Sequence, residues 1–277
     1  TTPWTLPGNT AICVGPNLEY SRVLVNGKKY VVATDLLDSL KDEFGWENVE
    51  VVNNFYGTDL EYVKYKHPFM DRISPVVLGD HVTLDAGSGL VHTAPSYGED
   101  DFNVGKKYNL EMVFGVDDNG CLNAESGERF KGLFFEDANK EVVKYLDELG
   151  VLLKLKFITH SYPHDWRTKK PIIFRATAQW FCSIDKIKDD ILNEIDNNIN
   201  WLPEWGKVRL HNMIEGRGDW CISRQRVWGV PLPIFYNEDG SAILDYDVMM
   251  HVAELFREHG SNYWFMKDAK DLLPEGY

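Results

Sequence analysis

The stretch from Asp85 to Phe102 reads D-A-G-S-G-L-V-H-T-A-P-S-Y-G-E-D-D-F, and the rest of the chain is organised around it. Gly87 and Gly89 permit tight turns or the close approach of a ligand. The run 90–93 has strand character and carries a histidine towards its end, and the acids at 99–101 suit the first turn of a helix. An imidazole, hydroxyls and three carboxylates so close together indicate the wall of a site.

Each feature of this stretch also has a purely structural explanation. The glycines do not continue into a dinucleotide-binding loop, because the third glycine of G-x-G-x-x-G would fall at His92. Acids at a helix start often only complement the helix dipole, and a single histidine closing a strand is more often structural than catalytic. The functional interpretation therefore depends on the combination and on the rest of the chain.

A chain of 277 residues is long enough for a substantial core and more than one domain. Its hydrophobic content of 44% is that of an ordered protein. No apolar run reaches the length of a membrane-spanning helix, and the first residues lack a signal-peptide pattern. The cysteines form no C-x-x-C motif, which disfavours a zinc ribbon and favours reduced thiols in the cytoplasm. A start at Thr1 rather than methionine favours a processed chain or a piece of a larger protein.

The net charge of −14 disfavours broad electrostatic capture of nucleic acid. Only residues 157–233 have a basic excess, with 11 basic and 9 acidic side chains. Within them, basic residues at 167, 169, 170 and 175 are interleaved with Trp166, Phe174 and Trp180, a pattern that could meet a nucleic-acid strand. His160 and His164 have a spacing that could hold a metal on a helix, but Pro163 between them disfavours that helix. We therefore expect a solvated or interface loop here, and we expect any polyanion contact to be local.

The hydrophobic pattern predicts one β-rich α/β domain over residues 1–158. Asn26-Gly27 is a strong hairpin signal, and Thr34 is expected to cap a helix that Gly45 ends. Beyond residue 201 there is too little sequence to form a core of its own. The further strands are expected at 11–14, 19–25, 49–55, 76–78 and 151–158, and the further helices at 99–108, 137–149, after Ser183, and at 248–259.

Three blocks together resemble the isoleucyl-tRNA synthetases of the bacterial type. They are T-T-P-W-T-L-P-G-N (1–9), G-S-G-L-V-H-T-A-P-S-Y-G-E-D-D-F (87–102) and W-C-I-S-R-Q-R-V-W-G-V-P-L-P (220–233). The segments S-Y-P-H-D-W-R-T-K-K-P-I-I-F-R-A-T and H-G-S-N-Y-W-F favour this family over its valyl and leucyl relatives. The synthetic signatures H-I-G-H and K-M-S-K-S are absent from the sequence.

The resemblance implies an internal fragment of such a synthetase in three segments. Residues 1–158 would form the core of a barrel-like, β-rich α/β editing domain with short helices. Residues 159–200 would be a return linker that contains the basic and aromatic stretch, and residues 201–277 a partial segment of the class I catalytic domain. The loop Ser96-Tyr97-Gly98 departs from the Gly-His-Gly that this family usually has after Ala-Pro.

The function that the resemblance implies is hydrolysis of valine wrongly esterified to the 3′ end of tRNA(Ile). One missing methylene changes binding by only about 1–3 kcal/mol, and discrimination between isoleucine and valine by isoleucyl-tRNA synthetases is the general example of this limit. The resemblance therefore implies a second pocket that removes the errors. By resemblance, Asp101 would hold the substrate's ammonium group and His92 would exclude isoleucine. Thr1, Thr2, Thr5 and Asn9 would line the pocket and position the ribose or the water.

The resemblance also covers cofactors and partners. Gln225 and Trp228 match positions near the synthetic amino-acid pocket. Editing would need neither metal nor cofactor, whereas ATP and Mg would act only in the full-length parent. The expected partners are tRNA(Ile) carrying valine and the rest of the synthetase, with no membrane contact and a monomeric chain. Three alternatives stay open: a non-catalytic module binding the tRNA 3′ end, the editing domain of a valyl-tRNA synthetase, and a metallohydrolase using His92, Asp100 and Asp101.

Overall fold

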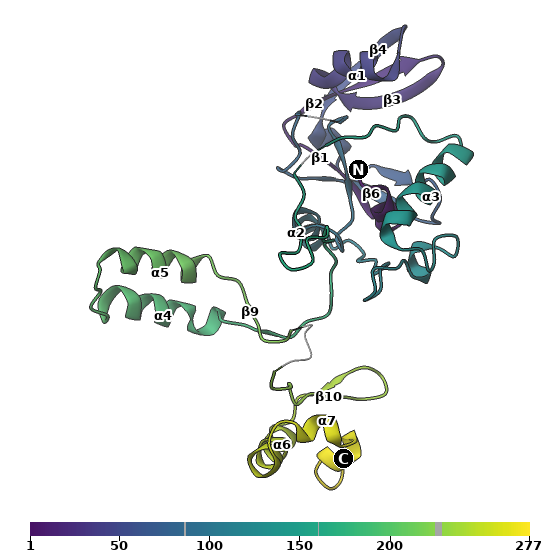
Figure 1. The fold of residues 1–277 in the computed structure, drawn as a ribbon. Helices are drawn as coiled ribbons and strands as arrows, with labels where there is room; N and C mark the ends of the chain where they lie inside the picture. Colours follow the sequence, from purple (N-terminus) through teal and green to yellow (C-terminus); the bar gives the residue numbers. More distant parts are fainter. Residues whose placement is uncertain (86, 160, 225–228) are drawn as a thin grey trace. The chain divides into compact units, whose positions relative to one another are not determined.

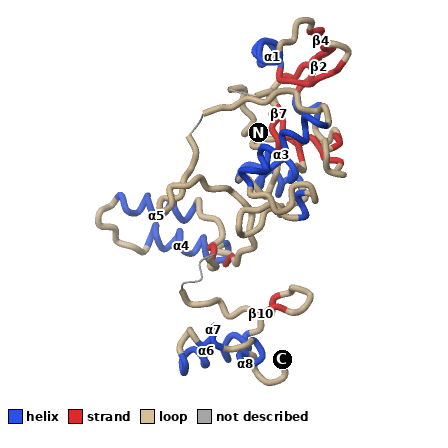
Figure 2. The backbone as a smooth tube through the Cα atoms, turned by 45° about the vertical axis from the view of Figure 1, so that its right-hand side comes forward, coloured by secondary structure: helices blue, strands red, loops and turns tan. Residues whose placement is uncertain are grey.

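The computed structural model describes residues 1–85, 87–159, 161–224 and 229–277. The chain divides into two compact units, Thr1–Thr177 and Ala178–Tyr277. Figures 1 and 2 show small sheets and short helices joined by long loops, so the expected mixed α/β class is confirmed. The division at residues 158 and 200 into functional segments stays a prediction, because compactness does not assign a function to a segment.

The first unit is built on a four-stranded sheet of order β5-β6-β1-β7. These strands are β1 (Ala11–Val14), β5 (Lys64–Lys66), β6 (Ile73–Leu78) and β7 (Leu90–Thr93). β1 pairs in parallel with β6 and antiparallel with β7, with Ile12 opposite His92. Alternate residues of a strand point to opposite faces of the sheet, so Cys13 lies on the face opposite to that of Ile12 and His92. There it packs in a core with Val77 of β6 and with Val104 of α2 (Glu99–Tyr108). His92 therefore projects from the face that α2 does not cover.

A second sheet of order β3-β2-β4 holds the predicted hairpin. Its strands are β2 (Glu19–Val25), β3 (Lys28–Ala33) and β4 (Val49–Tyr56), and α1 (Leu37–Phe44) packs on them through Leu37 and Leu40. The hairpin is confirmed: Asn26 and Gly27 have φ values of 49° and 77°, as a tight two-residue turn requires. Gly45 ends α1 in the left-handed conformation, as expected.

The expectation that Thr34 caps this helix is wrong. Residues Thr34–Leu36 form the short 3-10 turn η2 ahead of α1, and the hydroxyl of Thr34 bonds that of Ser21 at 2.9 Å. The side chain of Thr34 is thus engaged across β2 and makes no capping bond to the start of α1. A tertiary contact has taken the hydroxyl that local sequence rules assign to the helix.

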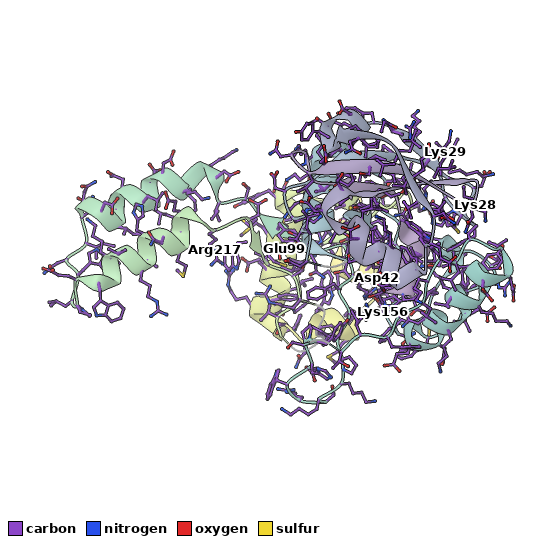
Figure 3. All side chains as sticks on the ribbon, turned by 90° about the horizontal axis from the view of Figure 1, so that it is seen from above. Lys28, Lys29, Asp42, Glu99, Lys156 and Arg217 are labelled. Carbon is purple, nitrogen blue, oxygen red and sulfur yellow. The ribbon has the colours of Figure 1, made fainter. Side chains whose placement is uncertain are left out.

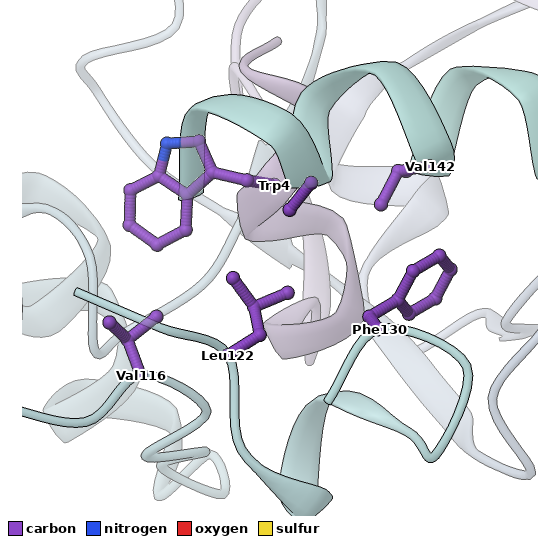
Figure 4. Close-up of a cluster of buried hydrophobic side chains, with 6 residues drawn as sticks. Trp4, Val116, Leu122, Phe130 and Val142 are labelled. Atoms are coloured by element: carbon purple, nitrogen blue, oxygen red, sulfur yellow. The ribbon is translucent and has the colours of Figure 1, made fainter. Parts of the chain in front are cut away.

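The N-terminal segment is anchored in a separate hydrophobic core. The 3-10 helix η1 (Pro3–Gly8) inserts Trp4 beside α3 (Phe135–Glu148), as Figure 4 shows. The backbone N–H of Trp4 donates to Asn139 Oδ1 at 3.0 Å. Trp4 is 5% exposed, and its neighbours in this core are Val116, Leu122, Phe130, Ala138 and Val142. Burial of this tryptophan anchors residues 1–9, the threonine-rich segment, in the first unit.

The strand expected over residues 151–158 is not formed. The described residues of this segment pair with no strand, and the side chain of Phe157 is 91% exposed. Lys156, labelled in Figure 3, reaches Glu43 of α1 with an N–O distance of 3.2 Å. Alternating hydrophobic residues predicted a strand, but a strand also needs an available sheet edge, and the segment runs as an extended loop.

The second unit contains a helical hairpin and a small core. The hairpin consists of α4 (Asp185–Asn197) and α5 (Trp205–Glu215). Two short antiparallel strand pairs belong to the same unit: β8 (Phe181–Cys182) pairs with β9 (Trp220–Cys221), and β10 (Phe235–Tyr236) pairs with β11 (Ala242–Ile243). The terminal helices are α6 (Tyr246–His259), α7 (Tyr263–Met266) and α8 (Ala269–Leu272). Phe235, Val248, Val252 and Leu272 are buried together, so the expectation that this segment has no core of its own is wrong. In the part of the chain that the structure describes, no helix is long and apolar enough to cross a membrane.

Candidate functional site

The imidazole of His92 is the centre of a hydrogen-bond network that reaches the threonine-rich segment. Asn9 Nδ2 lies 2.8 Å from His92 Nδ1, and Thr5 Oγ1 lies 3.0 Å from His92 Nε2. The hydroxyl of Thr5 donates in turn to the carbonyl of Thr2 at 2.8 Å. The structure thus brings His92 together with three predicted site residues of the N-terminal segment, Thr2, Thr5 and Asn9, which lie more than 80 positions earlier in the sequence.

Burial keeps His92 neutral. Loss of solvent lowers the pKa of its imidazole to about 3, against an ordinary value of 6.5, because the charged form is poorly stabilised in this environment. Thr5 and Asn9 are themselves buried, with 9% and 5% of their surface exposed. Thr1 and Thr2 are exposed, so only these two predicted threonines offer their side chains to solvent.

Asp101 lies in the first turn of α2, and its side chain bonds the backbone directly after β7, the strand that carries His92. Its Oδ2 accepts the backbone N–H of Ala94 at 2.9 Å, just beyond the end of β7. Burial raises the pKa of the Asp101 carboxyl, although the Ala94 N–H opposes that shift by favouring the charged form. Asp100 is exposed, so the two neighbouring carboxylates have different environments.

Three residues on the β5–β6 hairpin hold the threonine-rich segment in place. Arg72 Nη1 donates to the carbonyls of Pro7 and Asn9 at 3.1 and 2.9 Å, and His67 Nε2 bonds the carbonyl of Leu6 at 2.9 Å. The hydroxyl of Tyr65 donates to Asn9 Oδ1. Arg72 thus satisfies the carbonyls of Pro7 and Asn9 at the end of η1, whereas the Leu6 carbonyl also accepts the backbone N–H of Asn9 at 2.9 Å.

The sequence analysis did not single out Tyr65, His67 or Arg72. Their only sequence signal is polarity within a β-rich region, and polar residues there are normally assigned to the surface. The pairing spans about 60 positions, so no local pattern indicates it. The one indirect clue is general: free carbonyls at the end of a buried helix require donors from elsewhere.

Tyr97 lies in the loop 96–98 and packs against η1. Its ring packs edge-on against Trp4, with the centroids 4.9 Å apart, and its hydroxyl accepts the N–H of Gly115 at 3.0 Å. A Cβ at Gly8 would lie 2.5 Å from the Tyr97 ring, so only glycine fits there. The loop 94–98 is thereby fixed directly on η1.

The loop after residue 160 is extended and not helical. His164 pairs with Pro171 in an isolated bridge, and His164 Nδ1 bonds the carbonyl of Tyr162 at 2.8 Å. At its tip Trp166 is 69% exposed, with the Arg167 guanidinium 4.7 Å from its ring centroid. His160 lies outside the described residues. The expected loop is thus formed, with an aromatic ring and a cation at its tip, whereas its role as an interface stays a prediction.

Some predicted features are not covered. Gln225 and Trp228 lie outside the described residues, and their role stays a prediction. Across the described ranges, no three His, Cys, Asp or Glu side chains are grouped so that they could hold a metal ion. All four cysteines are free thiols.

Comparison with known proteins identifies the family. The model of the class I tRNA synthetases (I, L, M and V) matches residues 16–277. The chain belongs to this family. Isoleucine–tRNA ligase of Bacillus cereus strain AH187 is 60% identical over all 277 residues, and that of Bacillus anthracis strain CDC 684 is 59% identical. The chain spans 30% of the length of these relatives.

A solved structure titled "The crystal structure of GlLeuRS-CP1" overlaps part of this synthetase chain. It is 16% identical in sequence, with a TM-score of 0.43, and the overlap covers 59% of this chain and 82% of that one. So partial a likeness adds nothing to the assignment, which depends on the family match and on sequence identity.

Proposed function

We propose that the unit Thr1–Thr177 is an editing domain that hydrolyses valine from the 3′ end of mischarged tRNA(Ile). The observation that carries the proposal is the short strand β7. It presents His92 to the threonine-rich segment and, two residues later, offers the Ala94 N–H that orients Asp101. The 60% identity to isoleucine–tRNA ligases supports the choice of isoleucyl over valyl editing.

In this proposal Asp101 receives the α-ammonium of the valyl group. Its carboxylate is partly desolvated, as the raised pKa indicates, so a cationic partner would restore the stabilisation that burial removes. A hydrogen bond between ionised partners is about twice as strong as a neutral one. Because Oδ2 is held by Ala94, the carboxylate has a fixed orientation before substrate arrives.

We further propose that hydrolysis needs no metal or other cofactor and that ATP and Mg serve only the full-length synthetase. An aminoacyl ester is already reactive, so fixing water and carbonyl in line supplies most of the rate effect. In this proposal Thr1 and Thr2, whose side chains are exposed, contact that water or the terminal ribose. Outside the ester, the loop tip with Trp166 and Arg167 provides a local contact for the tRNA strand.

The test is deacylation of valyl-tRNA(Ile) and isoleucyl-tRNA(Ile) by the 277-residue chain, with and without a chelator. We expect hydrolysis of the valyl ester, little hydrolysis of the isoleucyl ester, and no effect of the chelator. Binding of both without hydrolysis would mean a non-catalytic tRNA-binding module. Sensitivity to the chelator would favour the metallohydrolase, and a preference for tRNA(Val) would favour the valyl relative.

A further inference from the structure

The side chain of Asn9 has no polar atom left for a substrate. Its Nδ2 donates to the carbonyl of Ala11 at 2.8 Å and lies 2.8 Å from His92 Nδ1. Its Oδ1 accepts the hydroxyl of Tyr65. Asn9 is 5% exposed, so the amide is enclosed by these partners. A residue in this position acts through its neighbours.

The carbonyl of Ala11 decides which way the Asn9 amide points. A carbonyl oxygen only accepts hydrogen bonds, so the atom that faces it must be the NH₂ group. The same NH₂ group then turns its second hydrogen towards His92 Nδ1. His92 Nδ1 must accept that hydrogen, and it therefore carries no proton of its own.

The single proton of the neutral imidazole is consequently on Nε2. From there it is donated to Thr5 Oγ1, 3.0 Å away, which leaves the hydrogen of Thr5 for the carbonyl of Thr2. Every donor in this chain of bonds has one acceptor. The opposite tautomer would place two N–H groups face to face between Asn9 and His92.

We propose that Asn9 is a positioning residue that holds His92 as its Nε2–H tautomer, so that His92 forms an uncharged wall of the site and not a base. Both ring nitrogens are occupied by protein partners, so proton abstraction would first require breaking one of these bonds. The C–H edges of the ring remain to meet an apolar side chain. The role of this wall in selecting valine rests on the proposed function, whereas the tautomer does not.

Two residues of the β5–β6 hairpin, Tyr65 and Arg72, hydrogen-bond to Asn9. Arg72 Nη1 holds the Asn9 carbonyl at 2.9 Å, while Tyr65 holds the far end of the amide. The side chain of Arg72 also pairs with Glu111, with an N–O distance of 3.3 Å. The main chain and side chain of Asn9 are therefore both fixed before any substrate binds.

The test is ¹⁵N NMR of the 277-residue chain with labelled histidine, recorded without tRNA. The ring nitrogens of protonated and unprotonated type differ widely in chemical shift, and His92→Gln identifies the His92 signals among the eight histidines. We expect an unprotonated Nδ1 and a protonated Nε2 near pH 7. A protonated Nδ1 in the wild-type chain would overturn the proposal without any variant.

Two variants separate positioning from packing. Asn9→Asp replaces the NH₂ donor by an acceptor, so we expect the proton to move to Nδ1 and the unprotonated Nδ1 signal to be lost. Tyr65→Phe removes one bond to the same amide but leaves the Ala11 carbonyl to orient it, so its spectrum should match the wild type. An unprotonated Nδ1 in a folded Asn9→Asp, or a changed tautomer in Tyr65→Phe, would overturn the proposal. Failed deacylation with the expected spectra would count against the proposed function alone.

Discussion

Asp101→Asn separates the binding role of this carboxylate from its structural role. An asparagine oxygen can still accept the Ala94 N–H, which Asp101 Oδ2 now accepts at 2.9 Å. The substitution removes a negative charge that burial already disfavours, as the raised pKa of Asp101 shows. We therefore expect the melting temperature to be unchanged or slightly higher, while contact with the substrate ammonium is weakened.

The size of the kinetic effect follows from the type of bond that is lost. Hydrogen bonds to charged groups contribute about 1.5–3 kcal/mol. At about 1.4 kcal/mol per factor of ten, kcat/KM for valyl-tRNA(Ile) should fall by about 10- to 150-fold. Asp101→Ala should lose activity too, but it also leaves the N–H of the buried Ala94 unpaired, at about 1–3 kcal/mol of stability.

The measurement is the initial rate of valyl-tRNA(Ile) deacylation together with a thermal melt for each variant. Asp100→Asn is the matched control, because it removes the same charge one residue earlier from an exposed side chain. The Asp100 side chain is exposed and has no proposed contact with the substrate, so the control should change the rate little and the free energy of unfolding by no more than about 0.5 kcal/mol. Full activity in Asp101→Asn, or an equal loss in Asp100→Asn, would refute the reasoning.

Three further outcomes test the site and the fold. His92→Ala should open space and allow hydrolysis of isoleucyl-tRNA(Ile) as well; loss of both activities would indicate a base instead, and a lower Tm with unchanged discrimination a structural role. The pKa of His92 is about 3 in the folded chain and 6.5 ordinarily, so the unfolded chain binds the proton first on acidification. The free energy of unfolding should therefore fall below pH 6.5 by up to about 1.4 kcal/mol per pH unit. Urea unfolding at pH 7 and pH 5 measures this, and an equal pH slope in His92→Gln would contradict it. Gly57→Ala should cost about 1–3 kcal/mol in thermal unfolding, because its Cβ would lie 2.0 Å from the Gly15 carbonyl oxygen, whereas Gly218→Ala meets open space and should be silent.

Local structure was largely predictable where one signal acted alone. The turn at Asn26-Gly27 and the helix end at Gly45 were read correctly, because both need a positive φ that few residues tolerate. The helix that starts at Glu99 was also predicted from its acids. The expectation for Thr34 was wrong because its hydroxyl bonds Ser21, a partner that only the fold provides. The strand expected at 151–158 was wrong because an alternating sequence also needs a free sheet edge to pair with.

The sequence by itself determined the family and the residue types of the site, since long motifs such as residues 87–102 depend only on the order of the residues. Only the tertiary structure decided how those residues are connected. Asn9 and Thr5 meet His92 because η1 is fixed by Trp4 at one end and Arg72 at the other. Hydrogen bonds require atoms within about 3 Å. For residues more than 80 positions apart, that proximity is produced by the packing of the whole unit and by no local pattern.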